Sequence, residues 1–185
     1  MIFSRRLLPF IALGVIIGAL LTAGLKQSGE LELRLTLLKT QRPLLVLPMK
    51  PEERFTVHYF HSVENAPIWE EHSVDENGLI YIEEERYEKF GAGMGKMPGV
   101  GRMVRRGQYE VIEDMHMLVG DFILRIGSPG VDHTIIWRGI KKNLSLVAPH
   151  EAVQFTAKPV SILYKYWRQF VPHPATPRTE TNHDI

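Results

Sequence analysis

Residues 61–71, HSVENAPIWEE, gather the side chains best suited to chemistry: one imidazole, one hydroxyl and three carboxylates. The segment directly follows an alternating apolar stretch, FTVHYFH, which is typical of a strand. Residues at strand ends often bind ligands, but the same residue types also hold turns in place. The segment therefore leaves two interpretations open, a ligand site and a turn fixed by its own side chains.

His58 and His61 have the H-x-x-H spacing of many helical metal sites. In a strand, side chains an odd number of positions apart point to opposite faces, so this pair does not share one metal ion. For the same reason His61 and the adjacent Ser62 do not form a nucleophile and its base. No nucleophile elbow is present either, so we do not expect a hydrolase.

The glycine-rich stretch GAGMGKMPGVGR begins at Gly91 and resembles a phosphate-binding loop only superficially. A P-loop needs four residues between its first glycine and the Gly-Lys pair, followed by Ser or Thr, whereas here three intervene and Met97 follows. Met115-His116-Met117 offers soft ligands for copper, but in a strand the two methionines share one face and are simpler to explain as core residues. We expect no cofactor and no metal.

Residues 1–6 and 7–25 differ sharply in polarity. Leu7 to Leu25 contains no charged side chain and, as a helix, spans roughly 28 Å, about one hydrocarbon core. Arg5 and Arg6 precede it, so the positive-inside rule predicts a cytoplasmic N-terminus (1–6), a transmembrane anchor (7–25) and an extracytoplasmic domain. A signal peptide, cleaved or uncleaved, is the alternative. Gly14 and Gly18 have the G-x-x-x-G spacing of a helix-packing face.

The rest of the chain predicts an all-β fold. About ten short apolar stretches separated by turn residues indicate an antiparallel β-sandwich or a barrel-like domain. Asn77-Gly78 marks a hairpin, and NLSLV at 143–147 is read as a strand. Residues 159–171 form a short helix or a last strand, and 172–185 a disordered tail.

Charge and cysteine content narrow the function classes. The two arginines before the anchor leave 20 basic against 21 acidic side chains, a balance that does not indicate nucleic-acid binding. The absence of cysteine excludes disulfides, thiolate metal sites, cysteine nucleophiles and lipid attachment to cysteine. An exported domain of this kind must be stabilised by its core alone.

Four segments in order resemble the DUF1850 family: FTVHYFHSVENAPIWEEHSV, ERYEKFGAGM, LRIGSPGVDHTI and NLSLV. The resemblance covers about residues 31–158, within a β domain of residues 30–158. The family signature falls on His61, Ser62, Glu64, Pro67, Glu70, Gly91, Gly93 and His133. One departure is that Met94 and Gly95 follow the Gly-Ala-Gly turn, where the family usually has Leu-Pro.

The resemblance implies a non-enzymatic accessory component of a TAXI-type TRAP transporter, an ion-coupled solute transporter. Its expected partners are the membrane, the permease and the substrate-binding protein, and its expected place is the cytoplasmic membrane with the C-terminal domain outside. An alternative is a small exported module that binds a metal ion or a carboxylate through His61, Glu64, Glu70 and His133. An enzyme is the least favoured class, because no cofactor fingerprint or acid–base pair is visible.

Overall fold

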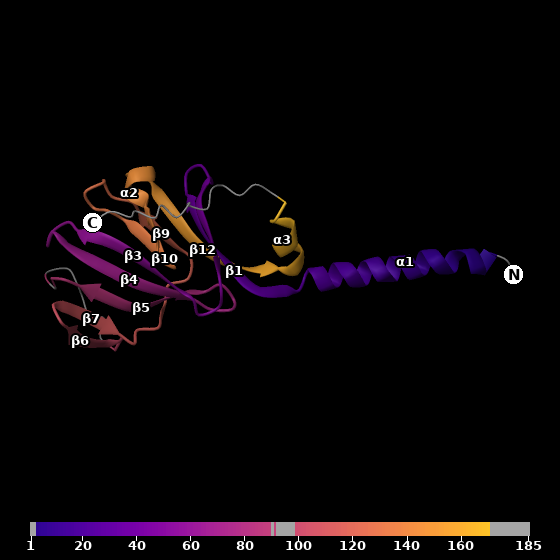
Figure 1. The fold of residues 1–185 in the computed structure, drawn as a ribbon, viewed down its shortest axis with the longest axis horizontal. Coiled ribbons are helices and arrows are strands. Elements are labelled where there is room, and N and C mark those ends of the chain that lie inside the picture. The colour runs from indigo at the N-terminus through magenta and orange to yellow at the C-terminus, as the bar shows by residue number, and fades with distance from the viewer. Residues whose placement is uncertain (1–2, 90, 92–98, 171–185) are drawn as a thin grey trace.

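The structure, a computed structural model, describes residues 3–89, 91 and 99–170, with side chains from residue 13 onward. It consists of a β domain from which one long helix, α1 (Phe3–Gly24), projects (Figure 1). The predicted tail, 172–185, and residues 1 and 2 of the predicted N-terminal segment lie outside the described residues.

The strands of the described part form two antiparallel sheets. The small sheet has the order β2 (Pro43–Met49), β1 (Gln27–Leu37), β12 (Ala152–Ser161) and β9 (Phe122–Arg125). The large sheet has the order β11 (Ile140–Asn143), β10 (Thr134–Trp137), β3 (Arg54–His61), β4 (Ala66–Val74), β5 (Ile80–Tyr87), β7 (Tyr109–Glu113) and β6 (Arg102–Arg106), and β8 (Met117–Leu118) pairs with β5. The all-β prediction is confirmed, in its sandwich form.

The core lies between the two sheets. Alternate residues of β1, such as Leu33 and Leu35, are fully buried, and Phe155 of β12 stacks on Phe55 of β3 across the interface. The alternation seen in the sequence thus becomes one face toward the core and one toward solvent. We call the Phe55 side of the large sheet its inner face and the opposite side its outer face.

The hairpin predicted at Asn77-Gly78 joins β4 to β5. The Asp75 carboxylate accepts hydrogen bonds from the backbone N–H groups of Asn77 (2.9 Å) and Leu79 (2.7 Å). Gly78 has φ +87°, and a Cβ there would lie 2.5 Å from the carbonyl oxygen of Ala157. Glycine is therefore required both by the backbone conformation and by the close approach of β12.

The prediction of a strand at NLSLV, residues 143–147, is wrong. Residues Leu144–Val147 form the helical turn α2, because the Asn143 side chain accepts a hydrogen bond from the Leu146 N–H (3.0 Å) and acts as an N-cap. A short apolar stretch does not separate a buried strand from a buried helical turn by periodicity alone. In this case the capping residue decides.

Residues 159–171, expected as helix or strand, are divided at Ser161. Strand β12 continues to that residue, whose hydroxyl accepts from the Tyr164 N–H (3.1 Å) and begins α3 (Ile162–Trp167). Helix α3 lies beside the junction of α1 and β1 (Figure 1). Among the described residues, no helix is both long and apolar enough to cross a membrane. The transmembrane assignment of 7–25 stays a prediction.

Candidate functional site

His61 and Glu64 form the turn between β3 and β4. His61 ends β3, and its Nδ1 accepts a hydrogen bond from the Glu64 N–H (3.3 Å), while its carbonyl accepts from the Asn65 N–H (2.9 Å). Asn65 has φ 45°, a left-handed conformation that asparagine tolerates. The first part of the signature therefore holds a turn, with Ser62 exposed at its tip.

Glu64 also lies against Gly91. A Cβ placed on Gly91 would be 2.3 Å from Oε1 of Glu64, closer than any real side-chain contact. The structure therefore brings together two signature residues that are 27 positions apart in the sequence. Gly93, the other signature glycine, lies outside the described residues.

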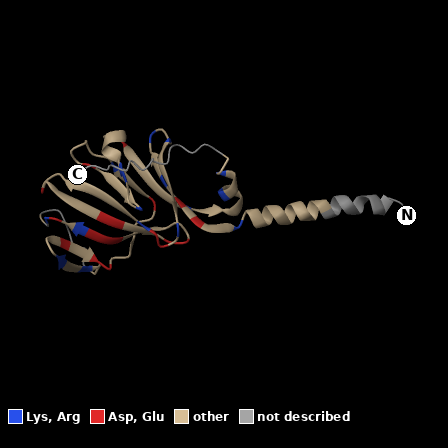
Figure 2. Cartoon of the chain, in the orientation of Figure 1, with Lys and Arg blue, Asp and Glu red and all other residues tan. Residues whose placement is uncertain are grey.

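Glu70 belongs to a network of polar side chains on the inner face. The Tyr59 hydroxyl donates to its Oε1 (2.8 Å), and the cross-strand partner Glu85 accepts from the Tyr87 hydroxyl. Burial raises the pKa of Glu70 to about 6, against the lowering effect of the Tyr59 hydrogen bond and with a further rise from Glu85. Figure 2 shows that acidic residues follow one another along β4 and β5. Glu70 is paired with Glu85 and Glu71 with Glu84, so like charges face each other across these two strands.

His133 is buried just before β10. Its Nδ1 accepts a hydrogen bond from the Gly127 N–H (2.9 Å), and its backbone N–H donates to the Ser145 hydroxyl (3.0 Å). The accepting Nδ1 puts the proton of the neutral ring on Nε2. Burial lowers the pKa of His133, and its ring lies 5.3 Å from that of Tyr59. His133 thus ties two loops to the inner face as a neutral side chain.

The signature residues form two separate groups. His61, Glu64 and Gly91 lie at the turn between β3 and β4, whereas Glu70 and His133 both contact Tyr59 on the inner face. His61 pairs with Ala66 and Glu70 pairs with Val57, so the two side chains start four strand positions, or roughly 13 Å, apart. Within the described part of the chain, no three His, Asp or Glu side chains come together as a group able to hold a metal ion. Pro67 lies on the outer side opposite Phe60. The geometry does not favour one pocket formed by His61, Glu64, Glu70 and His133.

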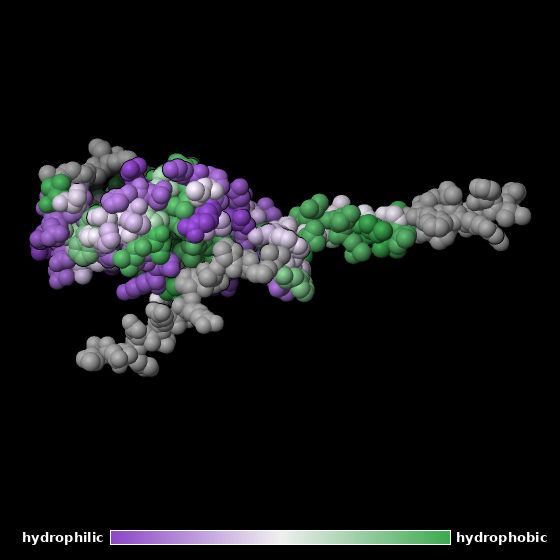
Figure 3. Space-filling view, turned by 90° about the horizontal axis from the view of Figure 1, so that it is seen from above, coloured by the Kyte–Doolittle hydropathy of each residue, from purple (hydrophilic) through white to green (hydrophobic). Residues whose placement is uncertain are grey.

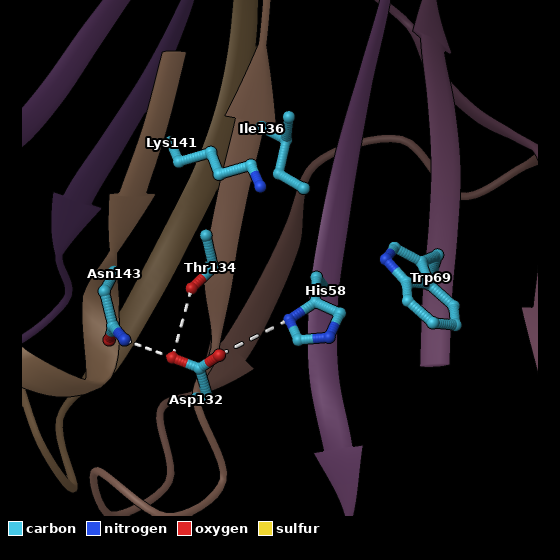
Figure 4. Close-up of a pocket in the computed structure, with 7 residues that line it drawn as sticks. All are labelled: His58, Trp69, Asp132, Thr134, Ile136, Lys141 and Asn143. Atoms are coloured by element: carbon cyan, nitrogen blue, oxygen red, sulfur yellow. Dashed lines mark hydrogen bonds and ion pairs between the residues drawn. The ribbon is translucent and has the colours of Figure 1, made fainter. Parts of the chain in front are cut away.

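The outer face carries a pocket that the sequence interpretation missed (Figure 4). One cross-strand row runs over four strands through Asn143, Thr134, His58 and Trp69. Two further residues, Ile136 and Lys141, come from β10 and β11, and Asp132 comes from the loop before β10. Because paired residues in a sheet share a face, this row places polar and aromatic groups side by side.

Asp132 organises one side of this pocket. Its carboxylate accepts hydrogen bonds from the Asn143 amide and the Thr134 hydroxyl (3.4 Å), and its other oxygen lies 3.6 Å from Nδ1 of His58. Asp132 has φ 56°, a left-handed conformation that aspartate adopts more readily than most residues. Burial lowers the pKa of His58, against the opposing effect of Asp132. His58 is therefore a neutral ring oriented by a carboxylate.

Trp69 forms the opposite side. Its ring lies 5.2 Å from that of His58 and 4.7 Å from the Arg86 guanidinium, and Tyr109 meets it edge-on at 5.5 Å. Within the described residues, the buried Nε of Arg86 has no hydrogen-bond partner, so stacking on the aromatic rings is its main interaction there. The Trp69 ring is thus fixed on both sides.

The sequence offered few signals for this pocket. The spacing of His58 and His61 predicts no shared metal site, and Asp132 and Lys141 stand in no motif. Their meeting depends on β10 lying next to β3, a long-range pairing that periodicity does not reveal. The adjacency of Asp132 to the signature residue His133 was the nearest hint in the chain.

Comparison with known proteins supports the family resemblance. Residues 55–144 match the model of DUF1850, described as a domain of unknown function. The matched segment contains the His61 turn, the inner-face network and the residues of the outer-face pocket. No curated protein and no solved structure matches the chain.

Proposed function

We propose that this protein is a non-enzymatic accessory component of a TAXI-type TRAP transporter, held in the cytoplasmic membrane by α1 with its β domain outside. The supporting observation is the way in which the apolar helix continues into the sandwich. Only Leu25 and Lys26 separate α1 from β1. The part of α1 next to the β domain, residues 13–24, presents a mainly apolar surface (Figure 3). A short connection of this kind keeps the domain close to whatever surrounds the helix.

The position of helix α3 also supports a β domain that lies next to the membrane. A Cβ on Gly24, the last residue of α1, would lie 3.4 Å from Cβ of Leu163. Near this contact, Tyr166, Trp167 and Phe170 expose 59%, 55% and 83% of their surface. Tyrosine and tryptophan are enriched where membranes meet water. An exposed aromatic cluster beside an apolar helix therefore suits the outer surface of a bilayer.

Ion pairs fix α3 at this place. Arg168 contacts Glu30 (2.7 Å) and Glu32 (3.2 Å) of β1, and Lys165 contacts Glu30 (2.8 Å). Glu32 is buried and also accepts from Arg34 (2.7 Å). These ion pairs fix the position of α3 against β1, and with it the exposed aromatic residues. The transporter itself enters this proposal only through the family resemblance.

The non-enzymatic part of the proposal rests on how the signature side chains are used. Nδ1 of His61 accepts from the Glu64 N–H and is not free to act as a base for Ser62. Glu70 and His133 are engaged in hydrogen bonds of the inner face. Groups that already hold the fold together have little capacity left for a reacting substrate.

Co-purification tests the transporter role. The full-length protein, tagged at its C-terminus, is extracted from its native membranes in a mild detergent, and a TAXI-type permease is expected in the eluate. Replacing residues 1–25 with a cleavable signal peptide should export the domain but lose the permease. A matched variant, Gly14→Leu with Gly18→Leu, separates anchoring from helix packing, since no heavy atom lies within 4 Å of a Cβ at either position. Absence of the permease from the unmodified protein's eluate would contradict the proposal.

A further inference from the structure

The outer-face pocket has the size and shape of a site for a small solute. Its volume is about 360 Å³, within the range of small-molecule sites. It opens on the solvent side of the large sheet, between β4 and β11 (Figure 4). Its lining residues come from regular strands, apart from Asp132, so their positions do not depend on a long loop.

One charge of the pocket, Lys141, can receive an anion. The single carboxylate, Asp132, accepts hydrogen bonds from the Asn143 amide and the Thr134 hydroxyl and faces His58, so both of its oxygens already have partners. Lys141 makes no ion pair within the described residues. In Figure 4 its side chain crosses the strand that carries Thr134 and Ile136, with the amine toward His58. An unpaired ammonium over a semi-enclosed surface is a site for a carboxylate.

The remaining walls are apolar. The side chains of Trp69 and Ile136 line the pocket on either side of His58 (Figure 4). Because Trp69 is held between the tilted His58 ring and the Arg86 guanidinium, little entropy is lost when a ligand packs against it. Flat or compact apolar groups fit such a surface better than highly hydrated ones.

We infer that this pocket binds a small organic carboxylate with an apolar body, the carboxylate at Lys141 and the body against Trp69 and Ile136. Asp132 acts as a positioning residue that orients His58. This inference does not depend on the transporter proposal, since its evidence lies in the pocket alone. A charged group without an apolar body would leave the Trp69 wall uncovered.

Calorimetric titration of the full-length protein in detergent tests the inference. The probes are benzoate and cyclohexanecarboxylate, and benzyl alcohol is the neutral comparison. Saturable binding of at least one carboxylate is expected, together with weaker or no binding of benzyl alcohol. Lys141→Met should weaken carboxylate binding by about ten- to a hundredfold, the effect of losing one charge-assisted hydrogen bond. Lys141→Arg, which keeps the charge, should retain most of the affinity.

Lys39→Met provides the matched control, because Lys39 is an exposed lysine in the turn between β1 and β2 of the small sheet. Its affinity should equal that of the unmodified protein. Lys141 is itself exposed, so its replacement leaves the fold intact, which thermal unfolding verifies. Three results would each overturn the inference: no saturable binding of either carboxylate up to about 10 mM, equal affinity for benzyl alcohol, or an unchanged affinity in Lys141→Met.

Discussion

The end of the molecule where α1 meets α3 and the outer face of the large sheet use the same residue types in opposite ways. At the α1 end the charges are paired, Arg168 with Glu30 and Glu32, and the aromatic Tyr166 and Trp167 are exposed. On the outer face the aromatic Trp69 is packed, and the cation Lys141 makes no ion pair in the described part of the chain. Paired charges with exposed rings suit attachment to a membrane, whereas a free charge with a fixed ring suits a solute.

The first test compares an apolar residue from the buried inner face of the large sheet with one from α3 at the α1 end. Ile68 is buried on the inner face against Tyr87 and Ile112, so Ile68→Ala should cost about 3 kcal/mol of unfolding free energy. Leu163 of α3 is 52% exposed, and Leu163→Ala should change the stability by less than about 0.5 kcal/mol in detergent. Chemical denaturation followed by circular dichroism measures both. A similar cost at the two positions would show that α3 is part of the core.

The second test breaks the ion-pair network. Arg168→Ala leaves Glu32, whose side chain is 4% exposed, with Arg34 as its remaining cation, and should destabilise the protein by about 2 kcal/mol. Hydrogen exchange should accelerate mainly in α3. The control is Arg138→Ala, because Arg138 pairs with Glu53 and is 47% exposed, so about 1 kcal/mol or less is expected. Equal effects would mean that the network does not fix α3.

The third test uses the pH dependence of stability. The folded pKa of Glu70, about 6, lies above its ordinary value of 4.5, so Glu70 stabilises the protein fully below pH 4.5 and this contribution is lost as the pH rises through 6. Burial lowers the pKa of His72 from 6.5 to about 4, so its contribution is present above 6.5 and lost as the pH falls toward 4. Between pH 4.5 and 6 the Glu70 contribution therefore lowers the unfolding free energy as the pH rises, whereas the His72 contribution raises it.

Glu70→Gln removes the Glu70 contribution to the pH dependence of stability, while the glutamine amide oxygen still accepts a hydrogen bond from Tyr59. The variant should gain about 1–2 kcal/mol at pH 7, and its stability should rise with pH across the whole His72 window. Denaturation curves at several pH values check this. A variant no more stable than the unmodified protein at pH 7 would mean that Glu70 is better solvated than the structure indicates.

The smallest expected effect concerns the contact between Gly91 and Glu64. Gly91→Ala should cost about 1 kcal/mol or less, because the obstructing atom is the end of a flexible side chain. In a Glu64→Ala background the same substitution should be neutral. The double-mutant cycle gives the coupling energy directly, and a value of zero would separate these two signature residues.

The fold was accessible from the sequence because alternation in β1 and β3 directly records which face is buried. Asn77-Gly78 fixed one hairpin in the same local way. The strand assignment of NLSLV failed because a single capping side chain, Asn143, outweighed the apolar pattern. Local chemistry was thus predicted well where it concerned turns and poorly where it competed with periodicity.

The candidate site could be predicted from the sequence much less well than the fold. His61, Glu64 and Gly91 belong to the family signature and are neighbours in space, but they hold a turn and do not form the predicted pocket with Glu70 and His133. Lys141 and Asp132 come to line one pocket with His58 only because β10 pairs with β3, and that pairing joins Thr134 to His58 across more than seventy positions of sequence. Contacts of that range depend on the order of strands in the sheet, which the order of strands in the chain does not determine.

The proposed position of the β domain outside a membrane is tested most directly by fractionation of cells that make the full-length protein. The protein is expected to stay in the membrane fraction after an alkaline carbonate wash. Protease added to intact spheroplasts should then degrade the β domain, while a cytoplasmic marker survives. Release of the protein into the soluble fraction, or protection of the domain until the membrane is opened, would contradict an α1-anchored domain on the outer side.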